Sequence, residues 1–367
     1  MTESNEASKT GPLANQFSAT MIKRVATMII LAGLLLACAT VLAGVPANTW
    51  VVCSDNGDPT DCDLRGFSGI QQAVNKAQAH DKILLKSGVY SPVSQLDVKY
   101  GDLTIRGAVL IEGKSIYLSA EPGAILDGGK GATVCALLIK NSNVKISNLE
   151  IQNFRAELEE DDIYDGHGIV AIDSEIQVNG VVLQRIKKMS VSLFGNSSAS
   201  LVSVQILDGH IGIWMNDETR IQVSNSIFKN NDSAAVAAYG QSSGSIVNSI
   251  VEGNLDDGIY AAEAAELDLR NSILIANKPY AVRAVDSGSI TLDYSILYKN
   301  EAPFYGGKND SHLNVGEHVY HADPELDARY LPRGSFTANK GDPEVRNRDG
   351  SVSDIGLFGG PEKLTSH

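Results

Sequence analysis

The feature that most constrains the fold of this chain is an internal repeat of about 23 residues. Six segments align, with successive steps of 22, 22, 22, 24 and 23 residues; they begin at Gly168, Ser190, Gly212, Ala234, Gly258 and Ala281. The second and fourth residues of each segment are apolar; they are Ile169 and Ala171, Val191 and Leu193, Ile213 and Met215, Ala235 and Ala237, Ile259 and Ala261, Val282 and Ala284. This alternation with a period of two predicts a strand with one buried face in every repeat.

A second strand repeats in the same register. Ile227, Ile250, Ile273 and Ile296 are 23 residues apart, and so are Asn225, Asn248 and Asn271. A further polar column contains Asp208, Asn230, Asn254, Asn277 and Asn300. Stacked strands lie about 4.8 Å apart, which lets amide side chains hydrogen-bond along the stack. We therefore predict an asparagine ladder.

Each repeat is too short for a β-α-β unit and fits one rung of a solenoid. Because parallel crossovers are right-handed, the sequence predicts an all-β fold, a right-handed parallel β-helix with rungs of about 23 residues. The segment Ser68–Gln71 fits a capping box that opens an amphipathic helix with Ile70, Ala73 and Val74 on its apolar side. We expect this N-terminal helix to cap the solenoid, since open strand edges invite aggregation.

The chain divides into four expected regions. Residues 1–47 are a signal peptide or membrane anchor with an N-terminal extension, and 48–82 hold a disulfide loop and the capping helix. Residues 83–304 form the parallel β-helix, and 305–367 form a C-terminal tail and cap.

The N-terminal segment has the pattern of a secretory signal. Lys23 and Arg24 precede an uncharged stretch from Val25 to Ala47. Three outcomes stay open: cleavage after Val45-Pro46-Ala47, lipid attachment at Cys38, or retention as a membrane-spanning anchor. Translation can start at the first or the second methionine of this region. All three outcomes predict an extracytoplasmic protein, secreted or anchored to the cell envelope.

The cysteines agree with export. Cys53 and Cys62 flank a short polar loop, and an exported chain can oxidise them, so we predict a Cys53–Cys62 disulfide. Cys135 lies in an apolar stretch and is expected to be a buried free thiol. No cysteine or histidine spacing typical of zinc is present.

The charge excludes one class of partner. The chain has 44 acidic and 30 basic residues, a net charge of −14, which repels DNA, RNA and anionic lipid headgroups. We expect no nucleic-acid partner, membrane contact only through the N-terminal segment, and a monomer. The same charge repels acidic polysaccharides unless calcium or a local basic surface opposes it.

The segment IQQAVNKAQAHDKILLKSGVY, followed by rungs with N-S-I strands and asparagine turns, resembles the pectin-lyase-like superfamily. It is most similar to exported parallel β-helix repeat proteins, and the tail DPELDARYLPRGSFTANKGDPEVRNRDGSVSDIGLFGG resembles the closing segment of bacterial members. The resemblance covers roughly Trp50 to Pro361. It implies a polysaccharide or cell-surface glycan as partner, but the superfamily includes lyases, hydrolases, epimerases and adhesive proteins.

Sugar-active members of this superfamily use the outer face of one sheet. The outward positions beside the apolar columns are expected to be Val170, Ser192, Trp214, Val236, Tyr260 and Arg283. Trp214 and Tyr260 are candidate platforms on which sugar rings stack, and Arg283 and Asp257 are candidate substrate-binding residues. The alternative is that a loop or the C-terminal tail covers the two aromatic rings.

An insertion interrupts the repeat between Ala136 and Gly168, a step of 32 residues. It holds a dense run of carboxylates, among them Asp161, Asp162 and Asp165. Hard oxygen ligands at this density can bind Ca²⁺, and we name these three as candidate ligands. The alternative is a solvated acidic loop.

The insertion ends in Tyr164-Asp165-Gly166-His167, which resembles the Asp-x-His element of alginate C5-epimerases. Such groups suit abstraction of the C5 proton of a uronate while a cation neutralises its carboxylate. Tyr164, Asp165 and His167 are therefore candidate catalytic residues, with Lys188, His210 or Arg283 as a positive partner. A structural role for His167 at the turn is the alternative.

Three functions follow from these residues. The first is a lyase or C5-epimerase of acidic polysaccharide, with calcium near Asp161, Asp162 and Asp165. The second is a non-catalytic adhesive or carbohydrate-binding surface protein. The third is a glycoside hydrolase that uses Asp256 or Asp257. Gly166-His167-Gly168 and Arg185-Ile186-Lys187 match short polygalacturonase motifs, but their order and spacing do not fit.

Overall fold

The computed structural model describes residues 47–57, 59–92, 95–129, 134–155, 166–307 and 312–361. The predictions for cleavage, lipid attachment and anchoring concern residues 1–47, which lie outside these ranges except for Ala47. Within the described ranges, no helix is long and apolar enough to cross a membrane.

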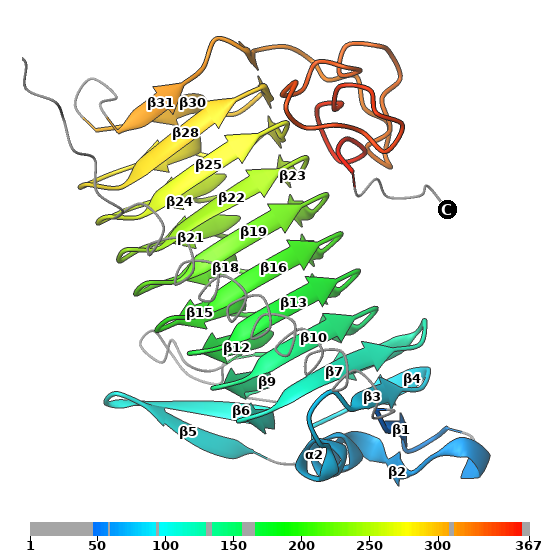
Figure 1. Cartoon of the computed structure of the whole chain (residues 1–367). Helices are drawn as coiled ribbons and strands as arrows, with labels where there is room; N and C mark the ends of the chain where they lie inside the picture. Colours follow the sequence, from blue (N-terminus) through cyan, green and yellow to red (C-terminus); the bar gives the residue numbers. More distant parts are fainter. Residues whose placement is uncertain are drawn as a thin grey trace, which may run out of the picture. The chain divides into compact units, whose positions relative to one another are not determined.

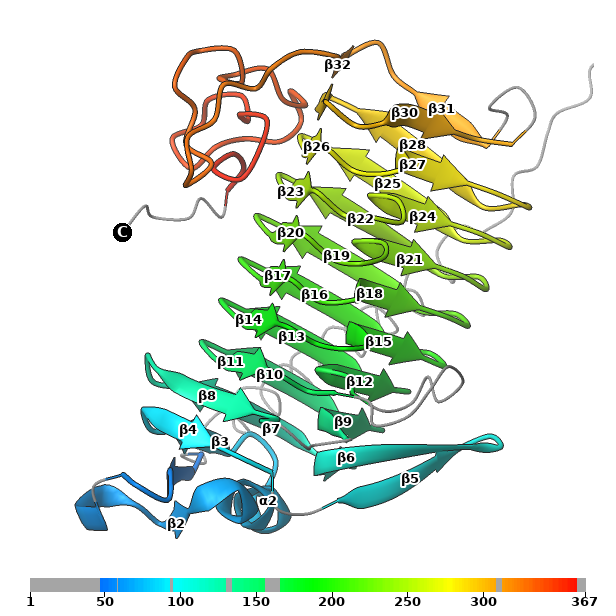
Figure 2. The same cartoon turned by 180° about the vertical axis from the view of Figure 1, so that it is seen from behind.

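Successive coils contribute strands to three sheets, and the stack confirms the predicted right-handed parallel β-helix (Figures 1 and 2). Sheet A, in spatial order, contains β2 (Leu64–Arg65), β1 (Thr49–Cys53), β3 (Lys82–Leu85), β7 (Ser115–Ala120), β10 (Asn143–Ser147), β13 (Glu175–Asn179), β16 (Ser198–Val202), β19 (Arg220–Ser224), β22 (Ser243–Val247), β25 (Glu266–Arg270), β28 (Ser289–Asp293) and β31 (Leu313–Val315).

Sheet B contains β32 (Val319–Tyr320), β29 (Ser295–Tyr298), β26 (Ile273–Ile275), β23 (Ile250–Glu252), β20 (Ile227–Lys229), β17 (Gln205–Leu207), β14 (Val182–Gln184), β11 (Glu150–Gln152), β8 (Ala124–Asp127) and β4 (Gly88–Tyr90). Sheet C contains β30 (Ala302–Tyr305), β27 (Tyr280–Ala284), β24 (Ile259–Ala261), β21 (Val236–Ala238), β18 (Ile211–Met215), β15 (Met189–Phe194), β12 (Ile169–Ile172), β9 (Cys135–Lys140), β6 (Leu103–Glu112) and β5 (Leu96–Tyr100). The pairing is parallel throughout these sheets except between β5 and β6.

The predicted columns of sheet C hold in most coils, with one shift of register. Ile169 pairs with Val191 and Val191 with Ile213, as the repeat predicts. In β21, however, Val236 pairs with Ile213, and Ala237 pairs with Trp214. The outward position predicted for Val236 is therefore wrong, and Ala237 occupies it. The run of small apolar residues from 234 to 238 fits either register, so alternation alone cannot place it.

Two rows of asparagine stabilise the turns. At the corner between sheets B and C, the side-chain Nδ2 of Asn231 donates to Asn254, Asn254 to Asn277, and Asn277 to Asn300, over 2.8–2.9 Å. The predicted ladder is confirmed for these last three residues. It is wrong for Asn230, because the ladder residue of that coil is Asn231. It is also wrong for Asp208, because the backbone N–H that Asn231 binds in the preceding coil is that of Gly209. Asn230 instead lies exposed and donates to Asp208 at 3.2 Å.

Helix α2 (Gly66–Lys76) lies at the N-terminal end of the solenoid, beyond β3 and β7 (Figure 1). Its buried side includes Phe67, Ile70 and Val74. The helix begins earlier than predicted, with Arg65 as its N-cap and no side-chain capping bond, so the capping box is wrong. Gln71 instead bonds the backbone N–H and C=O of Leu110, at 2.7 and 3.0 Å, and ties the helix to β6.

The predicted Cys53–Cys62 disulfide is confirmed, with the two Cα atoms 5.8 Å apart. It follows β1 and encloses the short 3-10 turn Pro59–Asp61. Cys135 is buried and not part of a disulfide.

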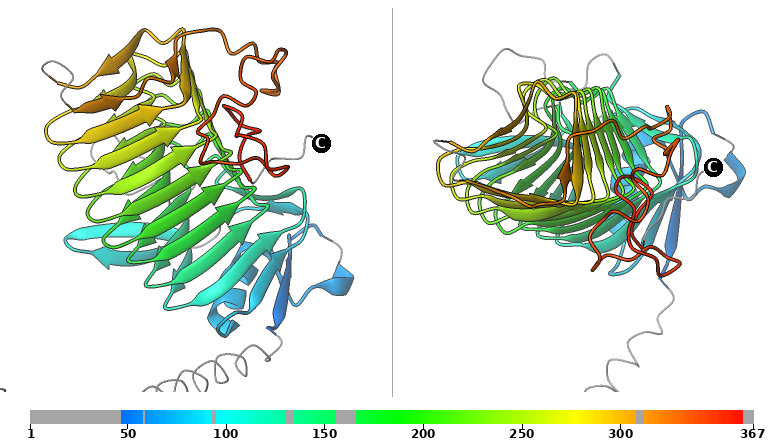
Figure 3. Two further views of the ribbon diagram at one scale, coloured as in Figure 1. Left: turned by 45° about the horizontal axis from the view of Figure 1, so that its top comes forward. Right: turned by 90° about the horizontal axis from the view of Figure 1, so that it is seen from above.

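The C-terminal tail folds against the outer side of sheet B (Figures 2 and 3). Ile355 and Leu357 pack on the outward isoleucine column formed by Ile227, Ile250, Ile273 and Ile296. The Asn225 side chain donates to the carbonyls of Leu357 and Gly359, each at 2.8 Å, so the second asparagine row holds the tail.

Candidate functional site

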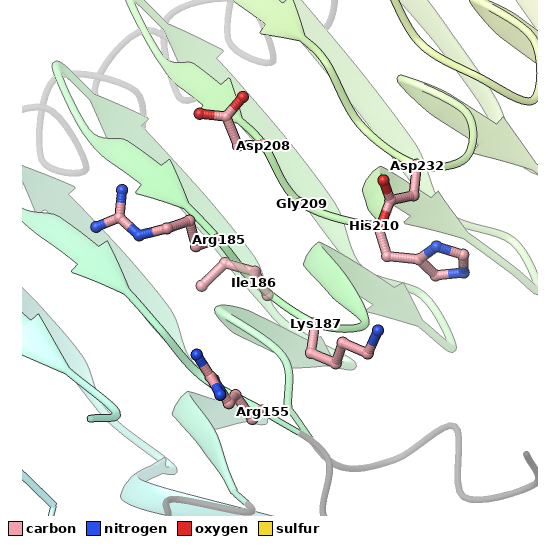
Figure 4. Close-up of a pocket in the computed structure, with 8 residues that line it drawn as sticks. All are labelled: Arg155, Arg185, Ile186, Lys187, Asp208, Gly209, His210 and Asp232. Carbon is pink, nitrogen blue, oxygen red and sulfur yellow. The ribbon is translucent and has the colours of Figure 1, made fainter. Parts of the chain in front are cut away.

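A hollow of about 450 Å³ lies at the corner where four successive coils turn from sheet B into sheet C (Figure 4). It is lined by Arg155, Arg185, Ile186, Lys187, Asp208, Gly209, His210 and Asp232. We call it the corner pocket. Three of its side chains are permanent cations and two are carboxylates, so its sign is opposite to that of the whole chain.

Local backbone geometry aims these side chains outward. Arg185 and Asp208 directly follow β14 and β17 and have positive φ angles of 54° and 52°. A residue in this left-handed region turns the chain sharply, which ends the strand and leaves the side chain at the corner. Because the turn repeats in each coil, charged groups from separate coils gather in one place.

Amide groups, rather than carboxylates, hold Arg185. Its Nε donates to Asn153 Oδ1 at 2.8 Å and its Nη1 to Gln184 Oε1 at 2.6 Å, and Nη2 donates to Gln152. Among the described residues, no carboxylate forms an ion pair with Arg155, Arg185 or Lys187. Among the described lining residues, the three cations therefore outnumber the two carboxylates by one and form no ion pair with them.

His210 is half-buried at the edge of the pocket, next to Asp232 of the following coil (Figure 4). Burial lowers the pKa of its imidazole; Asp232 opposes the change, and Lys187 and Lys188 add to it. The imidazole is therefore neutral near pH 7 and can accept a proton. The predicted candidates Lys188 and His210 thus lie within electrostatic reach of each other.

A row of aromatic rings, tilted against one another, continues from this edge onto the outer face of sheet C. The ring centroids of Trp214 and Tyr239 are 4.6 Å apart, and those of Tyr239 and Tyr260 are 5.5 Å apart. We call these three residues the aromatic row. Both Trp214 and Tyr260 are partly exposed, as predicted for sugar platforms. Tyr239 escaped the sequence prediction because it lies in the turn after β21, outside the outward column.

Arg283 extends the aromatic row by one more coil. Its guanidinium carbon lies 5.2 Å from the centre of the Tyr260 ring and 6.0 Å from that of Tyr305. Its Nη1 also lies 3.3 Å from the buried carboxylate of Asp257. Burial raises the pKa of Asp257 to about 6, although the neighbouring Arg283 lowers it. Of the four predicted substrate-binding residues, Trp214, Tyr260 and Arg283 therefore lie on one surface, and the buried Asp257 is paired with Arg283.

His167 lies in a different environment from the corner pocket. It is 1% exposed, and its Nδ1 is 2.6 Å from the Ser192 hydroxyl. This contact fixes the ring beneath the sheet surface, the arrangement expected of a structural histidine at the turn. A role in proton transfer for His167 stays a prediction.

The remaining candidates lie outside the described residues; they are Asp161, Asp162, Tyr164 and Asp165. The calcium site predicted there stays a prediction. In the described ranges, no cluster of three or more His, Cys, Asp or Glu side chains is arranged to hold a metal ion.

Comparisons with known proteins agree with the fold. Residues 135–322 match the family described as "Right handed beta helix region". No curated protein matches the sequence. Among solved structures, the pectate lyase Pel9A has a TM-score of 0.54 at 12% identity, covering 86% of this chain and 98% of that one.

Two further solved structures are less similar. An alginate lyase from Paenibacillus sp. str. FPU-7 has a TM-score of 0.39 at 14% identity, over 73% of this chain and 99% of that one. A pectate lyase from Paenibacillus sp. 0602 has a TM-score of 0.48 at 10% identity, over 78% and 87%. At these identities the likeness shows the fold alone.

Proposed function

The chain belongs to the right-handed β-helix family, and from that premise we propose that it binds an acidic polysaccharide and abstracts the C5 proton of a uronate unit. This step is shared by polysaccharide lyases and C5-epimerases. The observation that carries the proposal is the corner pocket, where three cations without an ion-pair partner among the described residues share one hollow with a half-buried His210 near the aromatic row.

Charge is the first requirement. A chain with a net charge of −14 repels a polyanion at long range, so binding needs a local surface of opposite sign. Arg155, Arg185 and Lys187 supply that surface. A guanidinium also pairs with a planar carboxylate through two parallel hydrogen bonds, which would orient the uronate.

Proton transfer is the second requirement. The C5 proton of a uronate becomes acidic enough to remove when cations stabilise the charge that develops on the adjacent carboxylate. The neutral His210 imidazole accepts this proton. In elimination, the C5–H electrons form a C4–C5 double bond, the C4–O bond breaks, and the leaving oxygen takes a proton from water. In epimerisation, C5 is reprotonated on its other face.

The aromatic row supplies the third requirement, a surface for the sugar rings. Its rings come from successive coils, and strands in a sheet lie about 4.8 Å apart, so a polysaccharide along the solenoid axis meets one ring after another. Non-catalytic glycan binding is the second candidate function, since the aromatic row would bind a neutral sugar without any chemistry.

A hydrolase is less well supported. Hydrolysis of a glycosidic bond needs two carboxyl groups that face the bond. Asp257 is buried and paired with Arg283, whereas its neighbour Asp256 is exposed.

We test the function with a panel of polyuronates and neutral glycans, each with added calcium and with a chelator. Binding is measured by calorimetry, elimination by the absorbance of unsaturated products, and epimerisation by nuclear magnetic resonance. We expect binding and C5 chemistry only with acidic polymers. Arg185→Gln should weaken binding at least tenfold, and His210→Gln should abolish turnover while binding persists.

Arg220→Gln is the matched control, because it removes the same charge from the exposed outer face of sheet A. Equal loss in both arginine variants would point to a general charge effect and contradict a site at the corner. Binding of neutral glycans without any chemistry would support the second candidate instead.

We also propose that the protein acts outside the cytoplasm, since a disulfide such as Cys53–Cys62 persists in oxidising compartments. Mass spectrometry of the mature N-terminus distinguishes the three outcomes: cleavage before Asn48, a lipid on Cys38, or an intact anchor.

A further inference from the structure

The outer face of sheet C is covered at one end and open at the other. The outward residues Leu138, Val170 and Ser192, from β9, β12 and β15, are each 0% exposed. Beginning with Trp214 in β18, the larger outward side chains are reached by solvent, and Tyr305 in the last coil is 39% exposed. The change occurs between one coil and the next.

The antiparallel hairpin β5–β6 covers the closed end. Its residues Val98 and Ile105 are buried in one apolar cluster with Leu138, Val170 and Phe194 of sheet C. These contacts join residues nearly one hundred positions apart in the sequence. The hairpin is therefore packed on the sheet, and a ligand cannot displace it without exposing this cluster to water.

A hydrogen bond fastens the hairpin at its tip. The Tyr100 hydroxyl donates to Asp217 Oδ2 at 2.6 Å, and its ring centroid lies 5.6 Å from that of Phe194. The same carboxylate oxygen accepts the backbone N–H of Gly195 at 2.8 Å. Asp217 lies two residues after β18, the strand that holds Trp214. The hairpin therefore ends at the coil where the aromatic row begins.

The corner pocket lies level with this boundary, at the start of the sheet C strands, whereas Asp217 lies at their other end. Arg185 and Lys187 precede β15, the last covered coil, and His210 precedes β18, the first open one. From β18 the open face continues for three coils to Arg283 in β27, or about 14 Å.

We infer that the open face is a binding surface, closed at one end by the hairpin, that recognises one end of a polysaccharide chain. The inference rests on the proposed function and adds to it the mode of attack. The terminal uronate occupies the corner pocket, and the rest of the chain extends along the aromatic row toward Arg283. Products are then released from a chain end, and internal bonds of a long polymer are not cut.

Chain-end recognition is tested by binding alone, with acidic polysaccharide fractions of one composition and different chain lengths. We expect the bound amount at equal mass of sugar to rise in proportion to the number of chain ends. Binding that follows total sugar and ignores chain length would overturn the inference but leave the proposed function intact. Absence of binding to every acidic fraction would instead refute the proposed function.

Product analysis gives a second measurement on the unaltered protein. If the reaction is elimination, a surface closed at one end releases one small product from the first minutes, with little loss of polymer viscosity. A broad ladder of oligosaccharides with a rapid fall in viscosity would overturn the inference.

A variant with a loosened hairpin tests whether the hairpin closes this end of the binding surface. Tyr100→Phe with Asp217→Asn removes the tip bond, which should loosen the hairpin and shift the products toward internal cleavage. Tyr117→Phe, on the exposed face of sheet A, is the control. If hydrogen exchange shows that the hairpin is loosened and the products are nevertheless unchanged, the hairpin does not form the end of the binding surface.

Discussion

The carboxylate of Asp257 and the guanidinium of Arg283 form an ion pair of 3.3 Å between neighbouring coils, although only one of the two partners is buried. The Asp257 side chain is 2% exposed and the Arg283 side chain 33%. The second oxygen of the carboxylate, Oδ1, is buried without a hydrogen-bond partner. Asp257 thus holds the Arg283 guanidinium over the Tyr260 ring, while one oxygen of its own buried carboxylate lacks a hydrogen bond, which is unfavourable.

This pair predicts an unusual dependence of stability on pH. Burial raises the pKa of Asp257 from 3.8 to about 6, so the folded state holds the proton more tightly than the unfolded state. The stabilisation is complete below about pH 4 and is lost as the pH rises through about 6, a change of about 3 kcal/mol. Asp257→Asn removes this pH dependence. The free energy of unfolding of the variant should therefore match that of the wild type near pH 4 and exceed it near pH 7.

Urea unfolding of the variant and the wild type across this pH range measures the difference between their free energies of unfolding. The other carboxylates contribute equally to both proteins and cancel in this difference. Asp256→Asn, at the exposed neighbouring position, is the control. A variant less stable than the wild type at neutral pH would show that the pairing with Arg283 outweighs the burial of the charge.

The pH profile of turnover reports on His210. Burial lowers the pKa of this imidazole, so its neutral form persists below the range in which an exposed histidine becomes protonated. We expect the acidic limb of kcat/KM against pH to lie below about 6.5, the ordinary histidine value, and to disappear in His210→Gln with the activity. A limb above that value would exclude His210 as the base.

The asparagine ladder should be a principal source of stability. Asn254 is fully buried; it accepts from the backbone N–H and the Nδ2 of Asn231, at 3.1 and 2.8 Å. Asn254→Ala leaves both donors without this partner, each at about 1–3 kcal/mol. Chemical denaturation should show a loss of about 3 kcal/mol or more. Asn196→Ala, at an exposed turn, should change stability by less than about 0.5 kcal/mol.

The disulfide stabilises the N-terminal coil. Cys53 and Cys62 are nine residues apart, and closing a loop of this size is worth about 2–3 kcal/mol. Adding a reductant should lower the thermal midpoint and increase hydrogen exchange in β1 and β2 first. Cys135→Ala should leave this response unchanged, and equal exchange with and without reductant would show that the coil does not depend on the bond.

Docking of the tail depends on a few apolar side chains. Leu357 is 4% exposed against the isoleucine column of sheet B, so Leu357→Ala should cost about 2–5 kcal/mol of docking energy. Limited proteolysis should then remove the tail faster while the coils stay intact. Val315→Ala, at a position 41% exposed, is the control. Equal cleavage rates in the two variants would contradict tight docking.

The coils could be predicted because side chains one repeat apart obey the same local constraint. Ile227, Ile250 and Ile273 face the same way since each follows an asparagine turn of the same length. The prediction failed where two registers fit equally well. Tandem Asn230 and Asn231 offer two candidates for one ladder position, and hydrogen bonds to the next coil select the second.

The site was less predictable because it depends on contacts between coils. Trp214 and Tyr260 fall in a column that alternation identifies, whereas Tyr239 joins them only through the shape of a turn. Arg185 and Lys187 belong to a short motif, but only the structure places them in one pocket with Arg155 from the coil before. Likewise, nothing in the segment 96–112 indicates that it covers sheet C.

The docking of the C-terminal tail also has a consequence for the order of synthesis. Ile355 and Leu357 cover isoleucines that leave the ribosome much earlier, beginning with Ile227. A nascent chain can therefore stack most of its coils while the apolar stripe formed by these isoleucines is still exposed to water. A chain truncated before Ile355 would therefore keep this apolar stripe exposed, a feature that favours aggregation.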